Sequence, residues 1–273
     1  MQRRYFNPKV FKVIISLYSF CIQLLLLDKS NFQPNSTITY LVFYYSRPTL
    51  MAAVPLIIDR IYKNVLSTVE KSGPFSSKFF QFCVDYRLRW NQIGMDSPLI
   101  NRIIFRRVQR MVGGNLKYIG VGSAPLAPVA QRFVRTVLDV KICQGYGLTE
   151  TLCTATGQGI HDLKTGNVGP PLVGIDIRLR SWEEGGYRIN DKIGSRGEIL
   201  VGGHHIAKEY FKMPEKTQEE FFNDSNGIRW FKTGDIGQFS KNGSLMIIDR
   251  KKDLVKPQGG EYISLGKGNF FNN

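Results

Sequence analysis

The 273-residue chain has few of the residues on which several common chemistries depend. Its three histidines show no metal-ligand spacing, and it has no Gly-x-Ser-x-Gly motif, so neither a zinc site nor nucleophilic catalysis has support. Four cysteines are widely separated, which is unlike a disulfide framework and indicates a reducing compartment. They are Cys21, Cys83, Cys143 and Cys153.

Acidic residues are scarce relative to basic ones. Lys and Arg total 37 against 22 Asp and Glu, a net charge of +15. This excess favours nucleotides, coenzyme A phosphates, anionic lipid surfaces or nucleic acid as partners. Because no nucleic-acid motif is present, we expect no nucleic-acid partner. The arginines between Arg102 and Arg110 form either a solvated helix face or a binding patch.

A long apolar run occurs only near the amino terminus. Val10 to Leu27 is an apolar run interrupted by Lys12 and Gln23, and basic residues precede it. A membrane anchor fits this pattern better than a signal peptide, because no small-residue cleavage site follows. A core helix, or an extension unrelated to the fold, is the alternative, since the run only just reaches spanning length.

Helical periodicity dominates from residue 50 to residue 114. Pro55 suits a first helical turn, and the helix that it begins is expected to close at Gly73. A second helix is predicted from Ser77 to Asn91. A third is predicted to begin at Ser97-Pro98 and to end before Gly113-Gly114. Their aliphatic stripes indicate core packing.

A strand-helix-strand unit follows. Leu116 to Val121 predicts a buried strand, Ala127 to Leu138 a helix, and Val140 to Cys143 a second buried strand. This order implies a right-handed parallel crossover. The loops after the two strands, Gly122-Ser123-Ala124-Pro125 and Gly145-Tyr146-Gly147, then lie at one sheet edge, where open α/β sheets bind ligands.

The pattern changes after Gly166 to short alternating strands separated by turn residues. Examples are Ile175 to Arg180, Glu198 to Val201 and Leu245 to Asp249, which predict a small β subdomain. The last stretch, Lys256 to Asn273, is rich in glycine and polar residues and offers no further core. The fold class is therefore α/β.

Three motifs carry the chemistry. They are Gln144-Gly145-Tyr146-Gly147-Leu148-Thr149-Glu150-Thr151, Thr233-Gly234-Asp235 and Asp249-Arg250-Lys251-Lys252-Asp253. Glycines, an aromatic ring, a hydroxyl and a carboxylate are suited to stacking a base and holding a magnesium phosphate. The alternatives are a glycine-rich turn with Tyr146 in the core, a capping role for Thr149 and an ordinary turn at Thr233.

In this order and spacing the motifs resemble the AMP-binding, adenylate-forming superfamily, and within it the long-chain acyl-CoA synthetases. The resemblance covers Arg47 to Lys267 and includes Asp59-Arg60-Ile61-Tyr62-Lys63-Asn64-Val65. It implies part of the large domain of an adenylate-forming enzyme. It also implies a ligase that converts fatty acid, ATP and CoA through an acyl-adenylate to acyl-CoA, AMP and pyrophosphate, with Mg²⁺ as cofactor.

The resemblance also implies a role for each matching residue. Thr149 and Glu150 would contact phosphate and Mg²⁺, Asp235 the ribose hydroxyls and Arg250 the ribose or phosphate edge. Lys252 would be the hinge about which a carboxy-terminal domain rotates. The residues implied to border the adenine are Gly122, Ser123, Ala124, Gly145, Tyr146 and Gly147.

The expected domains are a nonmatching extension (1–46), an α/β part (47–166), a β subdomain (167–250) and a hinge with the start of a carboxy-terminal domain (251–273). The family's phosphate loop and carboxy-terminal domain are not matched, so we expect impaired adenylation. A noncatalytic nucleotide-binding or acyl-binding remnant, or a membrane-tethered interaction module, is the alternative. The resemblance implies an intracellular, membrane-associated protein at the endoplasmic reticulum, mitochondrial outer membrane or lipid droplet.

Overall fold

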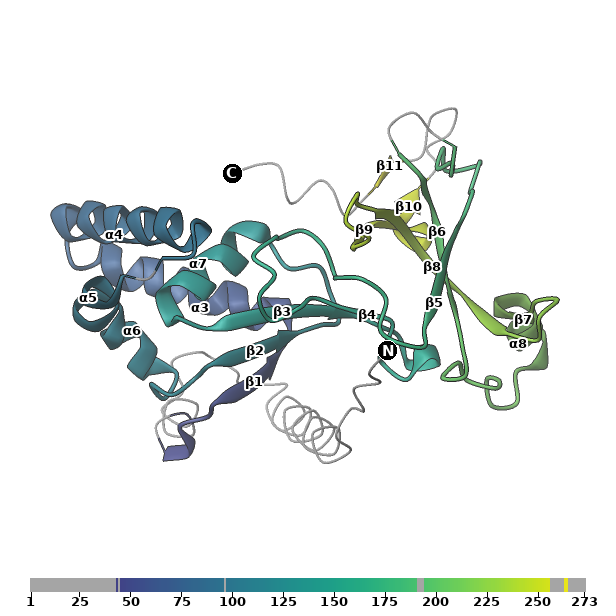
Figure 1. The fold of residues 1–273 in the computed structure, drawn as a ribbon, viewed down its shortest axis with the longest axis horizontal. Helices are drawn as coiled ribbons and strands as arrows, with labels where there is room; N and C mark the ends of the chain where they lie inside the picture. Colours follow the sequence, from purple (N-terminus) through teal and green to yellow (C-terminus); the bar gives the residue numbers. More distant parts are fainter. Residues whose placement is uncertain (1–42, 44, 96, 191–193, 256–262, 265–273) are drawn as a thin grey trace. The chain divides into compact units, whose positions relative to one another are not determined.

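The computed structural model describes residues 43, 45–95, 97–190, 194–255 and 263–264 (Figure 1). It comprises two compact units, Met1–Cys143 (unit 1) and Gln144–Asn273 (unit 2), and each is described by itself. The domain boundary expected at residue 166 falls inside unit 2. The apolar run from Val10 to Leu27 lies outside the described residues. Within the described residues, no helix is both long and apolar enough to span a bilayer.

Unit 1 combines a small sheet with helices around one hydrophobic core. Strands β1, β2 and β3 are neighbours in that order, and β1 pairs with β2 in parallel, with Leu50 opposite Tyr118. The elements are β1 (Leu50–Ala53), α3 (Pro55–Glu70), α4 (Pro74–Gln92), α5 (Pro98–Ile100), η1 (Asn101–Phe105), α6 (Arg106–Met111), β2 (Tyr118–Val121), α7 (Pro128–Leu138) and β3 (Lys141–Tyr146).

The predicted helices of unit 1 are confirmed, but their boundaries differ. Pro55 does begin α3, whereas Gly73 does not close it: α3 ends at Glu70, and Gly73, at φ 102°, caps the start of α4. A positive φ suits glycine, because it has no Cβ to clash. The predicted third helix is interrupted by the π-helical turn η1, which places Phe105 fully inside the core.

The core of unit 1 surrounds one buried cation. Phe105 packs edge-on against Phe80, with ring centroids 5.6 Å apart, and the Arg87 guanidinium lies 5.6 Å from the Phe105 ring centre. Arg87 is 1% exposed and pairs with Asp139 at 2.5 Å. Asp139 ends α7 in the left-handed conformation, φ 58°, and its other oxygen accepts a 2.7 Å bond from Asn101. The pair therefore ties α4 to α7 and η1.

One side of α4 carries exposed aromatic side chains. Phe75, Phe79, Phe82 and Tyr86 are 83%, 49%, 63% and 38% exposed, and their spacing places them on one side of the helix. Neighbouring ring centroids lie 6.3 Å apart for Phe82 and Tyr86, and 5.7 Å apart for Tyr86 and Trp90. We call these five side chains the α4 aromatic face. Large exposed apolar patches of this kind are characteristic of binding surfaces.

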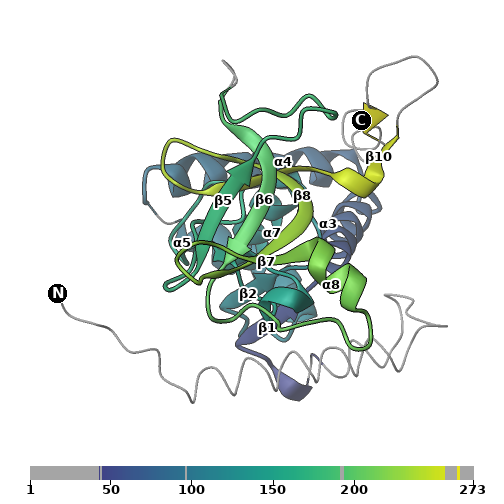
Figure 2. The same cartoon turned by 90° about the vertical axis from the view of Figure 1, so that its right-hand side faces the viewer.

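Unit 2 is built on an antiparallel sheet. Its strand order is β5-β6-β8-β7, with β9 also paired to β8, and Figure 2 shows β5, β6 and β8 side by side. The elements are η2 (Thr149–Thr151), β4 (Thr156–Gly157), β5 (Asp176–Arg180), β6 (Arg196–Gly202), α8 (Pro214–Glu220), β7 (Phe221–Asn223), β8 (Arg229–Phe239), β9 (Leu245–Arg250), η3 (Lys251–Asp253), β10 (Leu254–Val255) and β11 (Ile263–Ser264).

Strand β8 contains one of the three motifs. Thr233-Gly234-Asp235 lies inside this 11-residue strand, so its interpretation as an ordinary turn is wrong. Gly234 has φ 71°, and the β8–β9 pairing shifts register between Ile236 and Gly237. Both features bend the strand beside Asp235.

Strand β3 is longer than predicted. The sequence predicts Gly145 and Tyr146 in a loop, whereas in the structure they pair with Gly157 and Thr156 of β4 in antiparallel register. A Cβ at Gly145 would lie 3.3 Å from the Thr156 carbonyl oxygen, which is tighter than an ordinary contact. Glycine therefore allows this close approach, and the turn begins only at Gly147.

Candidate functional site

Three of the predicted site residues meet in unit 2. The Tyr146 hydroxyl donates a 2.8 Å hydrogen bond to Oδ2 of Asp235, and Nε of Arg250 lies 3.1 Å from Oδ1 of the same carboxylate. Asp235 on β8 and Arg250 on β9 are direct partners in the strand register, which places their side chains together. The fold thus gathers an aromatic ring, a carboxylate and a cation from three strands.

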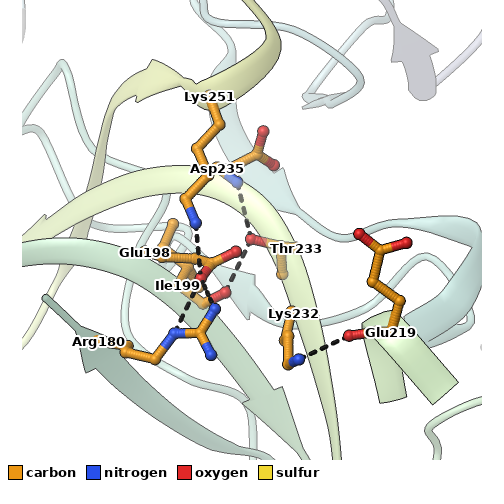
Figure 3. A network of polar contacts seen from close by, with 8 residues as sticks. All are labelled: Arg180, Glu198, Ile199, Glu219, Lys232, Thr233, Asp235 and Lys251. Atoms are coloured by element: carbon orange, nitrogen blue, oxygen red, sulfur yellow. Dashed lines mark hydrogen bonds and ion pairs between the residues drawn. The ribbon is translucent and has the colours of Figure 1, made fainter. Parts of the chain in front are cut away.

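Hydrogen bonds of the Thr233 hydroxyl fix the backbone position of Asp235. The Thr233 hydroxyl accepts a 3.0 Å bond from the backbone N–H of Asp235 and donates a 2.8 Å bond to the carbonyl of Ile199 on β6 (Figure 3). Thr233 is buried, so these bonds are shielded from water. The bent part of β8 is therefore held at the residue whose carboxylate faces Tyr146.

Burial controls the ionisation of this group. Loss of hydration raises the pKa of Asp235, while the bond from Tyr146 and the charge of Arg250 act in the opposite direction without cancelling it. Burial also raises the pKa of Tyr146, and the nearby Asp235 charge adds to this shift. The Tyr146 hydroxyl therefore remains a proton donor at neutral pH.

The arrangement retains capacity for a ligand. The Asp235 carboxylate has two oxygens that each accept more than one hydrogen bond. The Arg250 side chain is 54% exposed, so its outer nitrogens are accessible. The Tyr146 ring packs against the unit 2 core, in agreement with the alternative that places this residue in the core. Its hydroxyl is hydrogen-bonded to Asp235. A ligand with hydroxyl donors and an anionic group matches these side chains.

The segment at Gly147 has no room for a larger residue. A Cβ at Gly147 would lie 2.3 Å from the backbone carbon of Cys153, closer than side chains pack. The Thr151 hydroxyl accepts a 2.9 Å bond from the N–H of Leu148 and donates a 3.1 Å bond to its carbonyl. The capping role considered for Thr149 thus belongs to Thr151, and Thr149 is exposed.

Glu150 is held by residues that the sequence analysis missed. Its carboxylate oxygen Oε1 lies 2.8 Å from the Tyr210 hydroxyl, which also lies 2.6 Å from Oε2 of Glu220. The backbone carbonyl of Glu150 accepts a 2.9 Å bond from the N–H of Ala207. No local sequence pattern indicates these contacts, because they join residues 60 positions apart in the case of Tyr210.

A buried carboxylate holds the residue next to the predicted hinge. Glu198 on β6 is 3% exposed, and it contacts Arg180 on β5 at 3.1 Å from Nε and Lys251 in η3 at 3.0 Å (Figure 3). The Lys251 ammonium also lies 5.1 Å from the centre of the Trp182 ring. Lys252 is exposed. Side-chain contacts therefore anchor the chain at Lys251, and the hinge role of Lys252 stays a prediction.

The predicted adenine loop Gly122-Ser123-Ala124 belongs to unit 1. The N–H of Gly122 lies 3.4 Å from the carbonyl of Ala53, and Ser123 has φ 74°, a conformation uncommon for serine. The loop follows β2, as expected. Its grouping with Tyr146 in one pocket stays a prediction.

The carboxylate oxygens of Glu150 are the type of ligand that a hard cation such as Mg²⁺ prefers. Among the described residues, no group of three or more His, Cys, Asp or Glu side chains is arranged to hold a metal. Mg²⁺ differs from structural metals because it commonly uses one or two carboxylates together with water and substrate phosphates. The Glu150 carboxylate therefore fits a Mg²⁺ contact that a phosphorylated substrate completes.

Comparisons with known proteins identify the family of the chain. The family model described as AMP-binding enzyme matches residues 11–211, beginning well before Arg47. The chain therefore belongs to the AMP-binding enzyme family, and residues 11–46 are part of the matched region. Long chain acyl-CoA synthetase 8 of Arabidopsis thaliana is 46% identical over 227 residues, 81% of this chain and 32% of that protein.

Solved structures support the same fold. The adenylation domain of a carboxylate reductase from Mycobacterium chelonae has a TM-score of 0.63 at 23% identity, over 87% of this chain and 32% of that one. The A domain of a carboxylic acid reductase from Segniliparus rugosus, in complex with AMP and a carboxylic acid, has a TM-score of 0.58 at 25% identity, over 87% and 33%. The chain thus spans about a third of the length of these relatives.

Proposed function

We propose that unit 2 carries the ribose-binding part of an ATP site in a long-chain fatty acid–CoA ligase. The observation that carries this proposal is the Asp235 carboxylate, buried on β8 between the Tyr146 hydroxyl and the Arg250 guanidinium. The reaction is fatty acid, ATP and CoA to acyl-CoA, AMP and pyrophosphate. The similarity to Long chain acyl-CoA synthetase 8 and to an A domain bound to AMP supports it.

In this proposal each side chain acts through positioning or charge. Asp235 accepts hydrogen bonds from the ribose hydroxyls, and Arg250 contacts the ribose or phosphate edge. Thr149, exposed on η2, donates its hydroxyl to phosphate, and Glu150 contacts Mg²⁺. Bound Mg²⁺ supplies charge neutralisation as pyrophosphate leaves. The protein contributes orientation and a partly dry environment for Asp235.

We also propose that the protein works at an intracellular membrane surface, such as the endoplasmic reticulum, mitochondrial outer membrane or lipid droplet. The α4 aromatic face favours this location, because exposed aromatic side chains suit the interface between a bilayer and water. Lys78 and Arg89, exposed on the same helix, suit anionic headgroups. Flotation of the chain with anionic and neutral vesicles tests this location. Phe79→Ser should weaken flotation, and equal flotation would count against it.

The ligase proposal is tested by incubating the purified chain with ATP, Mg²⁺, CoA and a long-chain fatty acid. Nucleotide binding, pyrophosphate and acyl-CoA are measured for wild type, Glu150→Ala and the exposed control Glu184→Ala. Turnover lost only in Glu150→Ala supports the ligase. Nucleotide binding without turnover supports the noncatalytic alternative, and the absence of nucleotide binding in wild type would refute the proposed ATP site.

A further inference from the structure

The segment after β6 contacts Glu150 at two points. The N–H of Ala207 donates to the Glu150 backbone carbonyl at 2.9 Å, and the Tyr210 hydroxyl lies 2.8 Å from the Glu150 carboxylate. One contact fixes the backbone of η2, and the other fixes the direction of the side chain. Residues 207 to 210 therefore determine where this carboxylate lies.

The Tyr210 hydroxyl is itself held by the fold. The ring packs edge-on against Phe221, with centroids 5.3 Å apart, and the Lys216 ammonium lies 4.6 Å from its centre. The backbone N–H of Tyr210 donates a 3.0 Å bond to the Thr217 hydroxyl on α8. Glu220, at the end of α8, contacts the hydroxyl from a further direction at 2.6 Å. Contacts to α8 and β7 thus set the position of the hydroxyl.

We propose that Tyr210 is a positioning residue for Glu150, and that Glu220 holds the Tyr210 hydroxyl in place. This inference rests on the proposed contact between Glu150 and Mg²⁺. A carboxylate fixed by one hydrogen bond keeps its remaining lone pairs in a defined direction, which an octahedral cation such as Mg²⁺ requires. Tyr210 thus acts through Glu150 and does not itself contact the substrate.

Removal of the hydroxyl has a specific consequence. In Tyr210→Phe the ring keeps its packing against Phe221, but the donor between the Glu150 and Glu220 carboxylates is lost. The hydroxyl has one proton and donates to one of the two carboxylates at a time. Without this donor between them the two like charges repel each other at short range. Glu150 is then expected to rotate away and to lose its fixed orientation.

The binding experiment separates positioning from general damage. Affinity for ATP is measured by calorimetry with Mg²⁺ and with EDTA, for wild type, Tyr210→Phe, Glu220→Gln and Tyr118→Phe, a hydroxyl deletion on β2 of unit 1. Tyr210→Phe should weaken binding about tenfold with Mg²⁺ and leave binding in EDTA unchanged, since Glu150 acts through the metal. Glu220→Gln keeps an acceptor for the hydroxyl, so a smaller loss is expected, and Tyr118→Phe should match wild type.

A second measurement does not depend on nucleotide binding. Crystal structures of wild type and Tyr210→Phe without nucleotide should show the Glu150 carboxylate in different positions. An unmoved carboxylate, or an equal loss of ATP affinity with and without Mg²⁺, would overturn the proposal. If wild type binds no ATP, the proposed function fails, and the two crystal structures alone decide whether Tyr210 positions Glu150.

Discussion

The two units differ in how they use charge. Unit 1 contains 20 basic and 6 acidic residues, whereas unit 2 contains 17 and 16, so almost all of the net charge belongs to unit 1. The buried side chains of unit 1 are mainly apolar, with Arg87 as the buried cation among the described residues. Unit 2 buries three carboxylates, Glu198, Asp235 and Asp249, and each contacts a polar or charged side chain: Lys251, Tyr146 and Tyr187 respectively.

This difference separates a unit held by packing from one shaped by polar pairs. Burial of an ion pair contributes little net stability, because desolvation offsets the attraction. The polar contacts of unit 2 instead fix where particular atoms lie. The candidate site residues Tyr146, Asp235 and Arg250 form two such contacts, which share Asp235. We therefore expect unit 1 to be sensitive to cavities, and unit 2 to be sensitive to backbone fit and charge.

The largest effect is expected from a cavity in unit 1. Phe105→Ala removes a fully buried ring and should lower the unfolding free energy by about 3–5 kcal/mol. Phe75→Ala, at a side chain that is 83% exposed, is the control and should change it by less than about 0.5 kcal/mol. Urea unfolding measures both, and amide exchange shows whether the loss is confined to unit 1. Equal losses in the two variants would contradict a packing-dominated unit.

The next effect concerns the turn of unit 2. Gly147→Ala places a methyl group against the Cys153 backbone and should destabilise unit 2 by about 2–3 kcal/mol, since overpacking forces the turn to shift. At Gly159 an added Cβ meets nothing within 4 Å, so Gly159→Ala is the matched control. The same urea unfolding, with amide exchange of residues 147–154, compares them. Similar stability of the two variants would show that the turn adapts.

How much the sequence predicts differs between the units for a physical reason. Helices of unit 1 follow from residues three and four apart, so their existence is clear from periodicity, although the π-helical turn Asn101–Phe105 is not. The resemblance of the sequence to a known family also predicts Asp235 and Arg250 as site residues. It could not show their contact, because that depends on the β8–β9 register and its bulge. Tyr210 was missed since its contact with Glu150 is set by tertiary structure alone.

A smaller loss of stability is expected when the ion pair between Arg87 and Asp139 in unit 1 is broken. Asp139→Asn keeps a residue that tolerates the left-handed conformation but removes the negative partner of Arg87. Loss of one partner leaves a buried charge, and because the Asp139 side chain is 50% exposed we expect a loss of only about 1–2 kcal/mol. Asp85→Asn on the exposed side of α4 is the control in urea unfolding. No difference between the two would mean that Arg87 has sufficient other partners.

The smallest effect is a pH dependence in unit 2. Because burial raises the pKa of Asp235 above 3.8, the folded state keeps a proton that the unfolded state releases over the pH range just above that value. The unfolding free energy of wild type relative to Asp235→Asn should therefore fall as pH rises through this window. Urea unfolding at a series of pH values from about 3.8 upward measures the difference, and a rise with pH would contradict the sign.

Tyr146→Phe sharpens the same test. The hydrogen bond from Tyr146 lowers the pKa of Asp235, so its removal should raise that pKa further and extend the window to higher pH. The Asp235 carboxylate remains in this variant, which separates the effect of the hydroxyl from the effect of the charge. If the window does not move, the bond between Tyr146 and Asp235 contributes nothing to the ionisation of the site. Of the two contacts that lower the pKa of Asp235, only the one with Arg250 would then remain as a polar interaction that shapes the site in unit 2.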